Sequence, residues 1–356
     1  MARHRLPLPD RILHPAARAL WRPDSTLQLE LGDRAVIVQG PGVEAVRGIV
    51  GRRVAGEPAP DDSMQDAVQE LTEAGYLWPV DERAVARDEA PDSRLAPPTP
   101  RLAGELRAMT ARHGERAAEL LHARRHVSVL IQGDGRAGPL VAALLAAAGV
   151  GRVCVQETTR TARSVRMHQA LPGGIGPADE GRPFGAAASA AVHRAAPETD
   201  LRRPPSHEAP DLVLLAYDEP IDPDHRAALH TYGHAHLPIR LAADHGVVGP
   251  LVVPGLTSCL RCADLHRLDR DPAWTALAVQ LSTPPATGSA SPVTLAATLA
   301  AVAAGQALAY LDGEQPAAIE GTLEQHLPDW RLRRRSWPVH PECDCCRGPV
   351  FGRMDG

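Results

Sequence analysis

The chain has 356 residues, of which 44% are hydrophobic, 3% aromatic and 23% charged, and its formal net charge is −5. This length exceeds the roughly 250–300 residues at which a single hydrophobic core stops growing, so we expect two domains. The acidic balance, with an isoelectric point near 6.3, argues against general nucleic-acid binding, which needs a clearly basic domain.

The sequence contains neither lysine nor asparagine. The absence of lysine excludes a Schiff base and a lysine clamp on phosphate, and the absence of asparagine removes its amide as a metal ligand or oxyanion donor. No run approaches the roughly 20 apolar residues of a membrane span, and the charged N-terminus lacks the apolar core of a signal peptide. We therefore expect a cytoplasmic protein that does not enter a membrane.

The first predicted element is a β-hairpin. The segment LQLEL (27–31) alternates apolar and polar residues, and RAVIV (34–38) is rich in β-branched residues. Gly32 and Asp33 lie between them and are typical turn residues.

Helices follow the hairpin. Apolar residues recur at helical spacing over 43–50, and a better helix runs from the capping residues at 61–63 to Gly75. A short extended segment at 76–80 closes the module. This order of elements predicts a small winged-helix-like module over residues 1–80.

A charged, proline-rich segment at 81–100 reads as a linker. The second domain is expected over 101–356, and it begins with a helix at about 101–125 that is rich in Ala, Leu, Arg and Glu. This helix leads into the main α/β pattern.

That pattern is a β-α-β unit. HVSVLIQ (126–132) predicts a buried strand, the Ala/Leu-rich run at 139–150 a helix, and RVCVQE (152–157) a second strand. The turn between the first strand and the helix, GDGRAG at 133–138, has the G-x-G-x-x-G pattern of nucleotide-binding folds.

Each glycine of this turn has an expected role. Gly133 permits a tight turn, Gly135 a close backbone approach, and Gly138 the packing of the helix on the strand. Glu157 is the one acidic residue at the position that holds a ribose. Two interpretations stay open, a nucleotide site and a doubly wound sheet that has kept the turn without the ligand.

The remainder of the second domain contains one long irregular stretch and several further elements. Residues 158–210 are predicted to form loops. Further strands are expected at 211–218, 237–244 and 247–255, and helices at 224–233 and 291–313.

Five of the six cysteines form two clusters that predict a zinc site. Cys259 and Cys262 form one C-x-x-C pair; in the second cluster, Cys343 is followed by both Cys345 and Cys346, either of which can be the fourth ligand. Four thiolates leave no open coordination position, so the zinc is expected to be structural.

Taken together, these segments resemble the ThiF-type, ubiquitin-activating-enzyme-like fold. The resemblance rests on residues 126–157, on DLVLLAYDEP (211–220), on LVVPGLTSCLRC (251–262) and on PECDCC (341–346). It implies a Rossmann-like doubly wound domain with a zinc site, and frequently a homodimer.

The N-terminal module resembles the winged-helix element that binds leader peptides of ribosomally made, modified peptides, with SMQDAVQELTEAGYL (63–77) as its last helix. The combination is similar to the leader-binding partner proteins of azoline-forming, YcaO-type cyclodehydratases. A leader would join the exposed hairpin edge as an extra strand. The expected peptide-binding residues are Arg34, Ala35, Val36, Ile37 and Val38 of the strand, and Met64, Val68 and Leu71 of the helix.

The resemblance also carries a departure that bears on catalysis. Adenylating members of the family use an Arg, an Asn and a Lys around the triphosphate and an Asp near the reacting carboxylate. Here Asp218 stands at the acidic position and Arg160 or Arg163 can replace the arginine, but Lys and Asn are absent. We therefore expect a non-catalytic scaffold, and the question whether it binds ATP stays open. The alternatives are an adenylyltransferase and, on the glycine pattern alone, a dinucleotide-dependent oxidoreductase.

Overall fold

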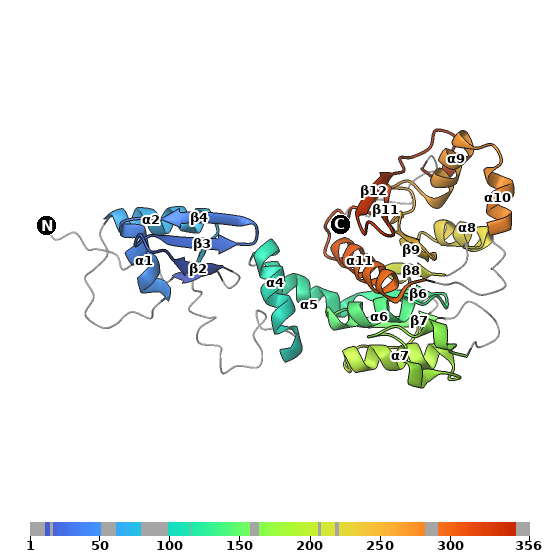
Figure 1. The fold of residues 1–356 in the computed structure, drawn as a ribbon, viewed down its shortest axis with the longest axis horizontal. Helices are drawn as coiled ribbons and strands as arrows, with labels where there is room; N and C mark the ends of the chain where they lie inside the picture. The colour runs from blue at the N-terminus through green and yellow to red at the C-terminus, as the bar shows by residue number, and fades with distance from the viewer. Residues whose placement is uncertain are drawn as a thin grey trace. The chain divides into compact units, whose positions relative to one another are not determined.

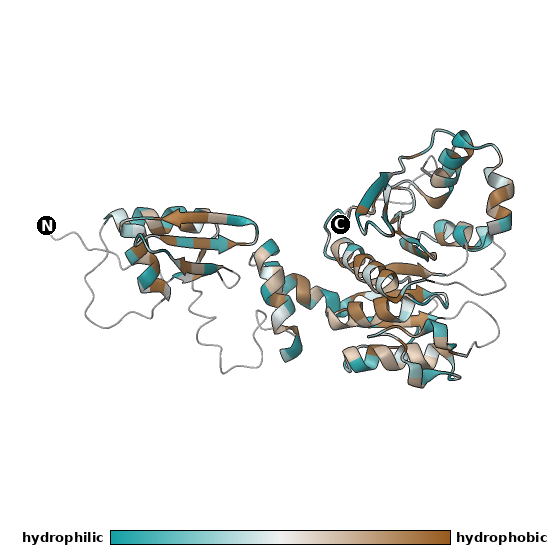
Figure 2. Ribbon diagram, in the orientation of Figure 1, coloured by the Kyte–Doolittle hydropathy of each residue, from teal (hydrophilic) through white to brown (hydrophobic). Residues whose placement is uncertain are grey.

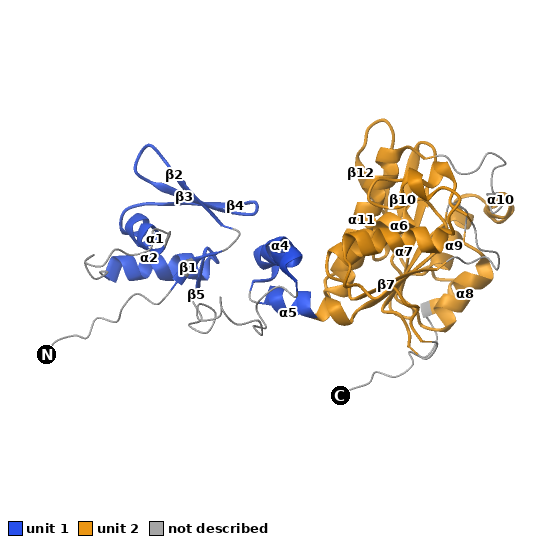
Figure 3. Cartoon of the chain, turned by 90° about the horizontal axis from the view of Figure 1, so that it is seen from below, with its two compact units in different colours: residues 1–122 blue, residues 123–356 orange. Residues whose placement is uncertain are grey.

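The computed structural model describes residues 11–14, 17–50, 62–79, 99–114, 116–156, 164–205, 208–217, 221–281 and 291–346. The chain divides into two compact units, residues 1–122 and 123–356 (Figure 3). Helices at 103–113 and 116–123, which the sequence analysis joined to the second domain, therefore group mainly with unit 1.

Unit 1 is built on a three-stranded antiparallel sheet of order β2-β3-β4. Its elements are β1 (Arg11–Leu13), β2 (Arg18–Trp21), β3 (Leu27–Leu31), β4 (Arg34–Val38), α1 (Pro41–Val50), α2 (Asp62–Glu73), β5 (Leu77–Pro79), α4 (Ala103–His113) and α5 (Arg116–Ala123). The predicted hairpin is confirmed, with Leu31 paired to Arg34 across a two-residue turn. Gly32 has φ of 64°, as the first central residue of a type II′ turn requires.

The strands and helices of unit 1 pack around one apolar core. The alternate residues of β3, Leu27, Leu29 and Leu31, are buried against apolar residues of α1 and α2. Strand β5 pairs with β1 in antiparallel fashion, a partner that the sequence analysis did not predict. The single helix expected at 101–125 is instead two helices, because the chain turns at Gly114, whose φ is 58°.

Unit 2 contains a seven-stranded mixed sheet of order β12-β11-β10-β9-β8-β6-β7 (Figure 1). Its strands are β6 (Ser128–Gln132), β7 (Arg152–Gln156), β8 (Leu212–Ala216), β9 (His236–Leu241), β10 (His245–Val248), β11 (Gly321–His326) and β12 (Leu332–Ser336). Strands β7, β6, β8 and β9 are parallel, whereas β10, β11 and β12 are added in antiparallel fashion. The expected Rossmann-like β-α-β unit is confirmed.

The helices of unit 2 are α6 (Gly138–Ala147), α7 (Phe184–Ala195), α8 (Pro223–Thr231), α9 (Leu260–Arg270), α10 (Trp274–Leu281) and α11 (Val293–Leu311). Helices α6 and α11 pack with Val129 and Ile131 on one face of the sheet, and α8 packs with Leu130 on the other. Figure 2 accordingly shows hydrophobic central strands. The prediction of loops over 158–210 was wrong for α7, which packs against α6 and β7.

Helix α11 is long and apolar enough, by length and composition alone, to cross a membrane. In the structure it lies against α6, β9 and β10, and its residues from Leu295 to Ala307 supply part of the main core. These contacts are those of a core helix.

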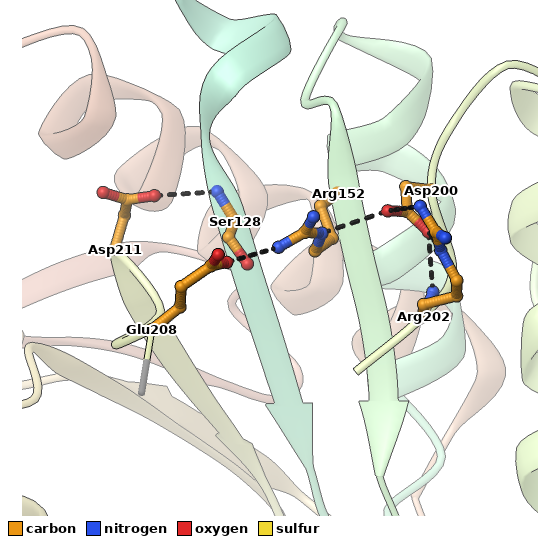
Figure 4. Close-up of polar contacts among 6 residues, drawn as sticks. All are labelled: Ser128, Arg152, Asp200, Arg202, Glu208 and Asp211. Atoms are coloured by element: carbon orange, nitrogen blue, oxygen red, sulfur yellow. Dashed lines mark hydrogen bonds and ion pairs between the residues drawn. The ribbon is translucent and has the colours of Figure 1, made fainter. Parts of the chain in front are cut away.

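Polar contacts fasten the loops at the starts of β6 and β7 (Figure 4). Asp211 accepts a bond of 2.8 Å from the Ser128 backbone N–H. Arg152 reaches Asp200 at 3.1 Å and Glu208 at 3.0 Å. This cluster lies at the opposite ends of the strands from the glycine-rich turn, and its charged groups pair with one another or with the backbone, so we assign it a structural role.

Candidate functional sites

The two cysteine clusters meet in unit 2. Cys259 and Cys262 flank the start of α9, and the Sγ atoms of Cys343 and Cys345 approach from the C-terminal segment. The Sγ–Sγ distances are 3.8 Å between Cys259 and Cys262, 3.7 Å between Cys259 and Cys343, and 3.6 Å between Cys262 and Cys345. All four ligand atoms lie within 4.8 Å of one another, so the cluster can hold a metal ion.

The spacing fits a tetrahedral thiolate site. With Zn–S bonds of about 2.3 Å, the edges of an S4 tetrahedron measure about 3.8 Å, which three of the distances approach. The fourth, between Cys343 and Cys345, is shorter at 3.0 Å, yet far longer than a disulfide bond of about 2.0 Å. Burial raises the pKa of Cys259 to about 12, and a bound cation would offset that penalty by favouring the thiolate.

The structure brings Cys345 into the cluster, which gives the second ligand pair a C-x-C spacing. The Cys346 side chain lies outside the described residues. A histidine supports this arrangement: His230 of α8 is 3.1 Å from the Cys345 carbonyl oxygen, to which its Nε2 can donate. The C-terminal segment is thus attached to α8 as well as to α9.

The glycine-rich turn is accounted for by its packing against β8. Gly133 has φ of 114°, and a Cβ there would lie 2.2 Å from the Ala216 carbonyl oxygen. The Gly135 N–H donates to that same oxygen at 2.9 Å. A Cβ on Gly138 would lie 3.1 Å from the Ala216 Cβ. Contact with the neighbouring strand therefore accounts for the glycines at 133 and 138.

Arg136, within the turn, was not predicted to matter. Its guanidinium donates through Nε and Nη2 to the Ala170 carbonyl, at 3.1 and 2.7 Å, and through Nη1 to the Ser291 carbonyl at 2.6 Å. These contacts fix two loops beside the turn. The candidate nucleotide residues Glu157 and Asp218, and the arginines at 160 and 163, lie outside the described residues.

The predicted peptide site lies on unit 1, where β4 is an edge strand among the described strands. Val38, Val68 and Leu71 are buried in the core and Met64 is half-buried, so these side chains form the support of the site more than its surface. Ile37, by contrast, is 50% exposed.

Residues Arg34, Ala35 and Val36 of the same strand differ in exposure. Arg34 and Ala35 are exposed and Val36 is half-buried. Arg34 donates to the Ala74 carbonyl just after α2, at 3.3 Å, which links the strand to the end of that helix.

The hairpin register decides which peptide groups of β4 face outward. Across a two-residue turn the flanking pair, Leu31 and Arg34, exchanges hydrogen bonds, and bonded pairs then alternate along the ladder. Arg34, Val36 and Val38 therefore bond to β3. The N–H and C=O groups of Ala35 and Ile37 point to the open edge.

No protein-family model and no curated protein matches this sequence. Solved structures do match. Escherichia coli MccB with MccA-N7isoASN is 14% identical, with a TM-score of 0.67, over 95% of this chain and all of that chain. MccB with ATP gives a TM-score of 0.68 at 14% identity, covering 94% of this chain and 99% of the other. The chain has the fold of MccB.

Another solved structure matches this chain over only part of its own length. A heterocyclase in complex with substrate and cofactor is 15% identical, with a TM-score of 0.58, and the match covers 95% of this chain but 39% of the heterocyclase chain. These likenesses confirm the ThiF-like fold that the sequence resembles. At this level of identity they establish the fold alone.

Proposed function

We propose that this protein binds the leader segment of a ribosomally made precursor peptide and presents the peptide to a YcaO-type cyclodehydratase. The observation that carries the proposal is the open edge of β4, with the outward backbone groups of Ala35 and Ile37. A disordered peptide can add a strand there, its main-chain bonds providing affinity and its side chains register. Unit 1 would be the winged-helix-like recognition module.

The comparisons support a peptide substrate and a cyclodehydratase partner. MccB is seen in complex with N-formylated MccA, and the heterocyclase in complex with substrate. This chain spans 39% of the heterocyclase chain, and we propose that it acts together with a cyclodehydratase.

A proline substitution in β4 tests whether the leader binds at the edge of this strand. Ile37→Pro removes an outward N–H while leaving the bonds to β3, so we expect leader affinity to fall at least about tenfold without loss of fold. The measurement is fluorescence polarisation of a labelled leader peptide, with thermal melting as the check on folding.

The matched control is Ala19→Pro on β2, the opposite edge strand, where the same alternation turns the residue 19 N–H outward. We expect leader affinity there to stay within about twofold of the unsubstituted protein. Equal loss in both variants, or no leader binding at micromolar protein, would count against the proposal.

An ATP-dependent adenylyltransferase is the second candidate, because MccB with ATP shares this fold. Against it, lysine and asparagine are absent, and the Arg136 guanidinium is bonded to loop carbonyls. Removing preorganised charge from a phosphoryl or adenylyl transfer site typically costs orders of magnitude in rate. We expect no ATP–pyrophosphate exchange by the purified protein with its precursor peptide, measured with radiolabelled pyrophosphate; robust exchange would favour the enzyme.

A further inference from the structure

A cavity of about 350 Å³ lies in unit 2 between β9, β10, the start of α8, α9 and α10. In Figure 1 these helices lie on the opposite side of β9 from α11. Leu237, Ile239 and Leu241 of β9 pack in the core with α11. The alternate residues Pro238 and Arg240 therefore face the other way and line the cavity.

The floor of the cavity is a row across three strands. Arg240 is opposite Val247 of β10, which is opposite Glu324 of β11. The Glu324 carboxylate already has partners: it forms an ion pair with Arg335 at 3.1 Å and accepts a hydrogen bond from the Thr322 hydroxyl at 2.9 Å. Among the described residues, no hydrogen bond or ion pair involves the Arg240 guanidinium.

The wall of the cavity adds positive charge. One carboxylate, that of Asp264 on α9, accepts from Arg226 at 2.6 Å, from Arg267 at 3.0 Å and from the Trp274 indole N–H at 3.4 Å. Two guanidinium groups thus share one carboxylate. Arg240 is an exposed residue. Partial desolvation and the nearby charge of Arg267 lower its pKa, and the charge of Asp264 opposes them.

The remaining lining is largely apolar. Leu260 and Ala263 of α9, and Trp274, Ala278 and Val279 of α10, provide this surface. The volume is at the small end of ligand sites, which are about 300–1,000 Å³, and suits a ligand the size of one or two amino-acid residues.

We propose that this cavity binds a carboxylate ligand, whose carboxylate lies on the Arg240 guanidinium and whose apolar body packs against Trp274 and α10. A planar guanidinium fork matches a carboxylate in a bidentate manner. A phosphate dianion needs more donors than one guanidinium supplies, and the Arg226 and Arg267 guanidiniums are already bonded to Asp264. The carboxylate can belong to a peptide C-terminus or to an acidic side chain. The site is on unit 2 and does not depend on leader binding by unit 1.

Small probes test the site in the full-length protein. We expect N-acetyl-leucine or N-acetyl-glutamic α-amide to bind at millimolar concentration in isothermal titration, and N-acetyl-leucinamide, which lacks the charge, to bind at least about tenfold more weakly. Tighter binding of the first probe identifies a chain end as the ligand group, and tighter binding of the second an acidic side chain.

Variants assign the binding to Arg240. Arg240→Gln should weaken the carboxylate probes at least about tenfold, Arg240→Lys should retain part of the affinity, and Arg333→Gln, outside the cavity, should change nothing. The proposal is overturned if Arg240→Gln binds the carboxylate probes as tightly as the unsubstituted protein does, or if the neutral amide binds as tightly as the carboxylates. It is also overturned if inorganic phosphate binds more tightly than both carboxylates, or if no carboxylate binds at concentrations up to about 20 mM. Thermal melting confirms that each variant is folded.

Discussion

Purified full-length protein is expected to contain one zinc ion per chain, and Cys345→Ser should abolish stoichiometric binding. The reason is geometric: the sulfur of Cys345 is 3.6 Å from that of Cys262 and completes the buried cluster. Structural zinc contributes about 10–16 kcal/mol to folding in small zinc domains. Loss of several kcal/mol should lower the melting temperature of a unit this size by about 10 °C or more. Elemental analysis and thermal melting measure both effects.

The neighbouring cysteine provides the control. Cys346→Ser should keep one zinc per chain and the melting temperature of the unsubstituted protein, because four thiolates are already present without it. The opposite result, with zinc lost from Cys346→Ser and retained by Cys345→Ser, would show that the ligand pair has C-x-x-C spacing. Protein purified without zinc and unaffected by a chelator would contradict the metal site altogether.

The sequence allowed two choices for the fourth ligand because spacing alone does not distinguish them. Both Cys345 and Cys346 stand close enough to Cys343 to share a metal ion. Two features of the structure position Cys345: the short helical turn at Asp344–Cys346 and the tertiary contact of His230 with the Cys345 carbonyl. Neither has a local signature in the sequence.

Local patterns predicted local structure well. The hairpin of β3 and β4 was predicted with its observed bounds, because period-two alternation and a glycine turn need no distant partner. The pairing of β1 with β5 joins residues near 12 and 78, and such non-local contacts leave no periodic trace. Helix α7 was missed because its alanine-rich sequence lies between proline- and glycine-rich loops.

Some residues of the candidate sites could be predicted from the sequence, and others could not. Cys259 and Cys262 were predicted from their spacing, and the edge of β4 followed from the hairpin. Arg240 could not be identified, because one arginine within an apolar strand looks the same whether its charge is paired or not. Only the structure shows that Asp264 is shared by Arg226 and Arg267, and that no ion pair within the described part of the chain involves the Arg240 guanidinium.

Arg124→Met is expected to destabilise unit 2 by about 3–5 kcal/mol, the usual cost of leaving one partner of a buried ion pair without the other. Arg124 and Asp312 are each 1% exposed. Their fork is bidentate, with Nε to Oδ1 at 2.9 Å and Nη2 to Oδ2 at 2.7 Å, and Nη1 also donates to the Ala148 carbonyl at 2.8 Å. Urea unfolding of the full chain, followed by circular dichroism, measures the loss.

A double variant separates the cost of an orphaned charge from the value of the pair itself. Arg124→Met with Asp312→Leu removes both charges together, and apolar replacement of buried pairs is often neutral or stabilising. We therefore expect it to be more stable than either single variant. The exposed pair of Arg333 and Asp329 is the control in the same unit: Arg333→Met should change stability by less than about 1 kcal/mol. A double variant that loses the sum of the two single losses would mean that the two side chains contribute independently, with no coupling across the fork, and would contradict the orphaned-charge explanation.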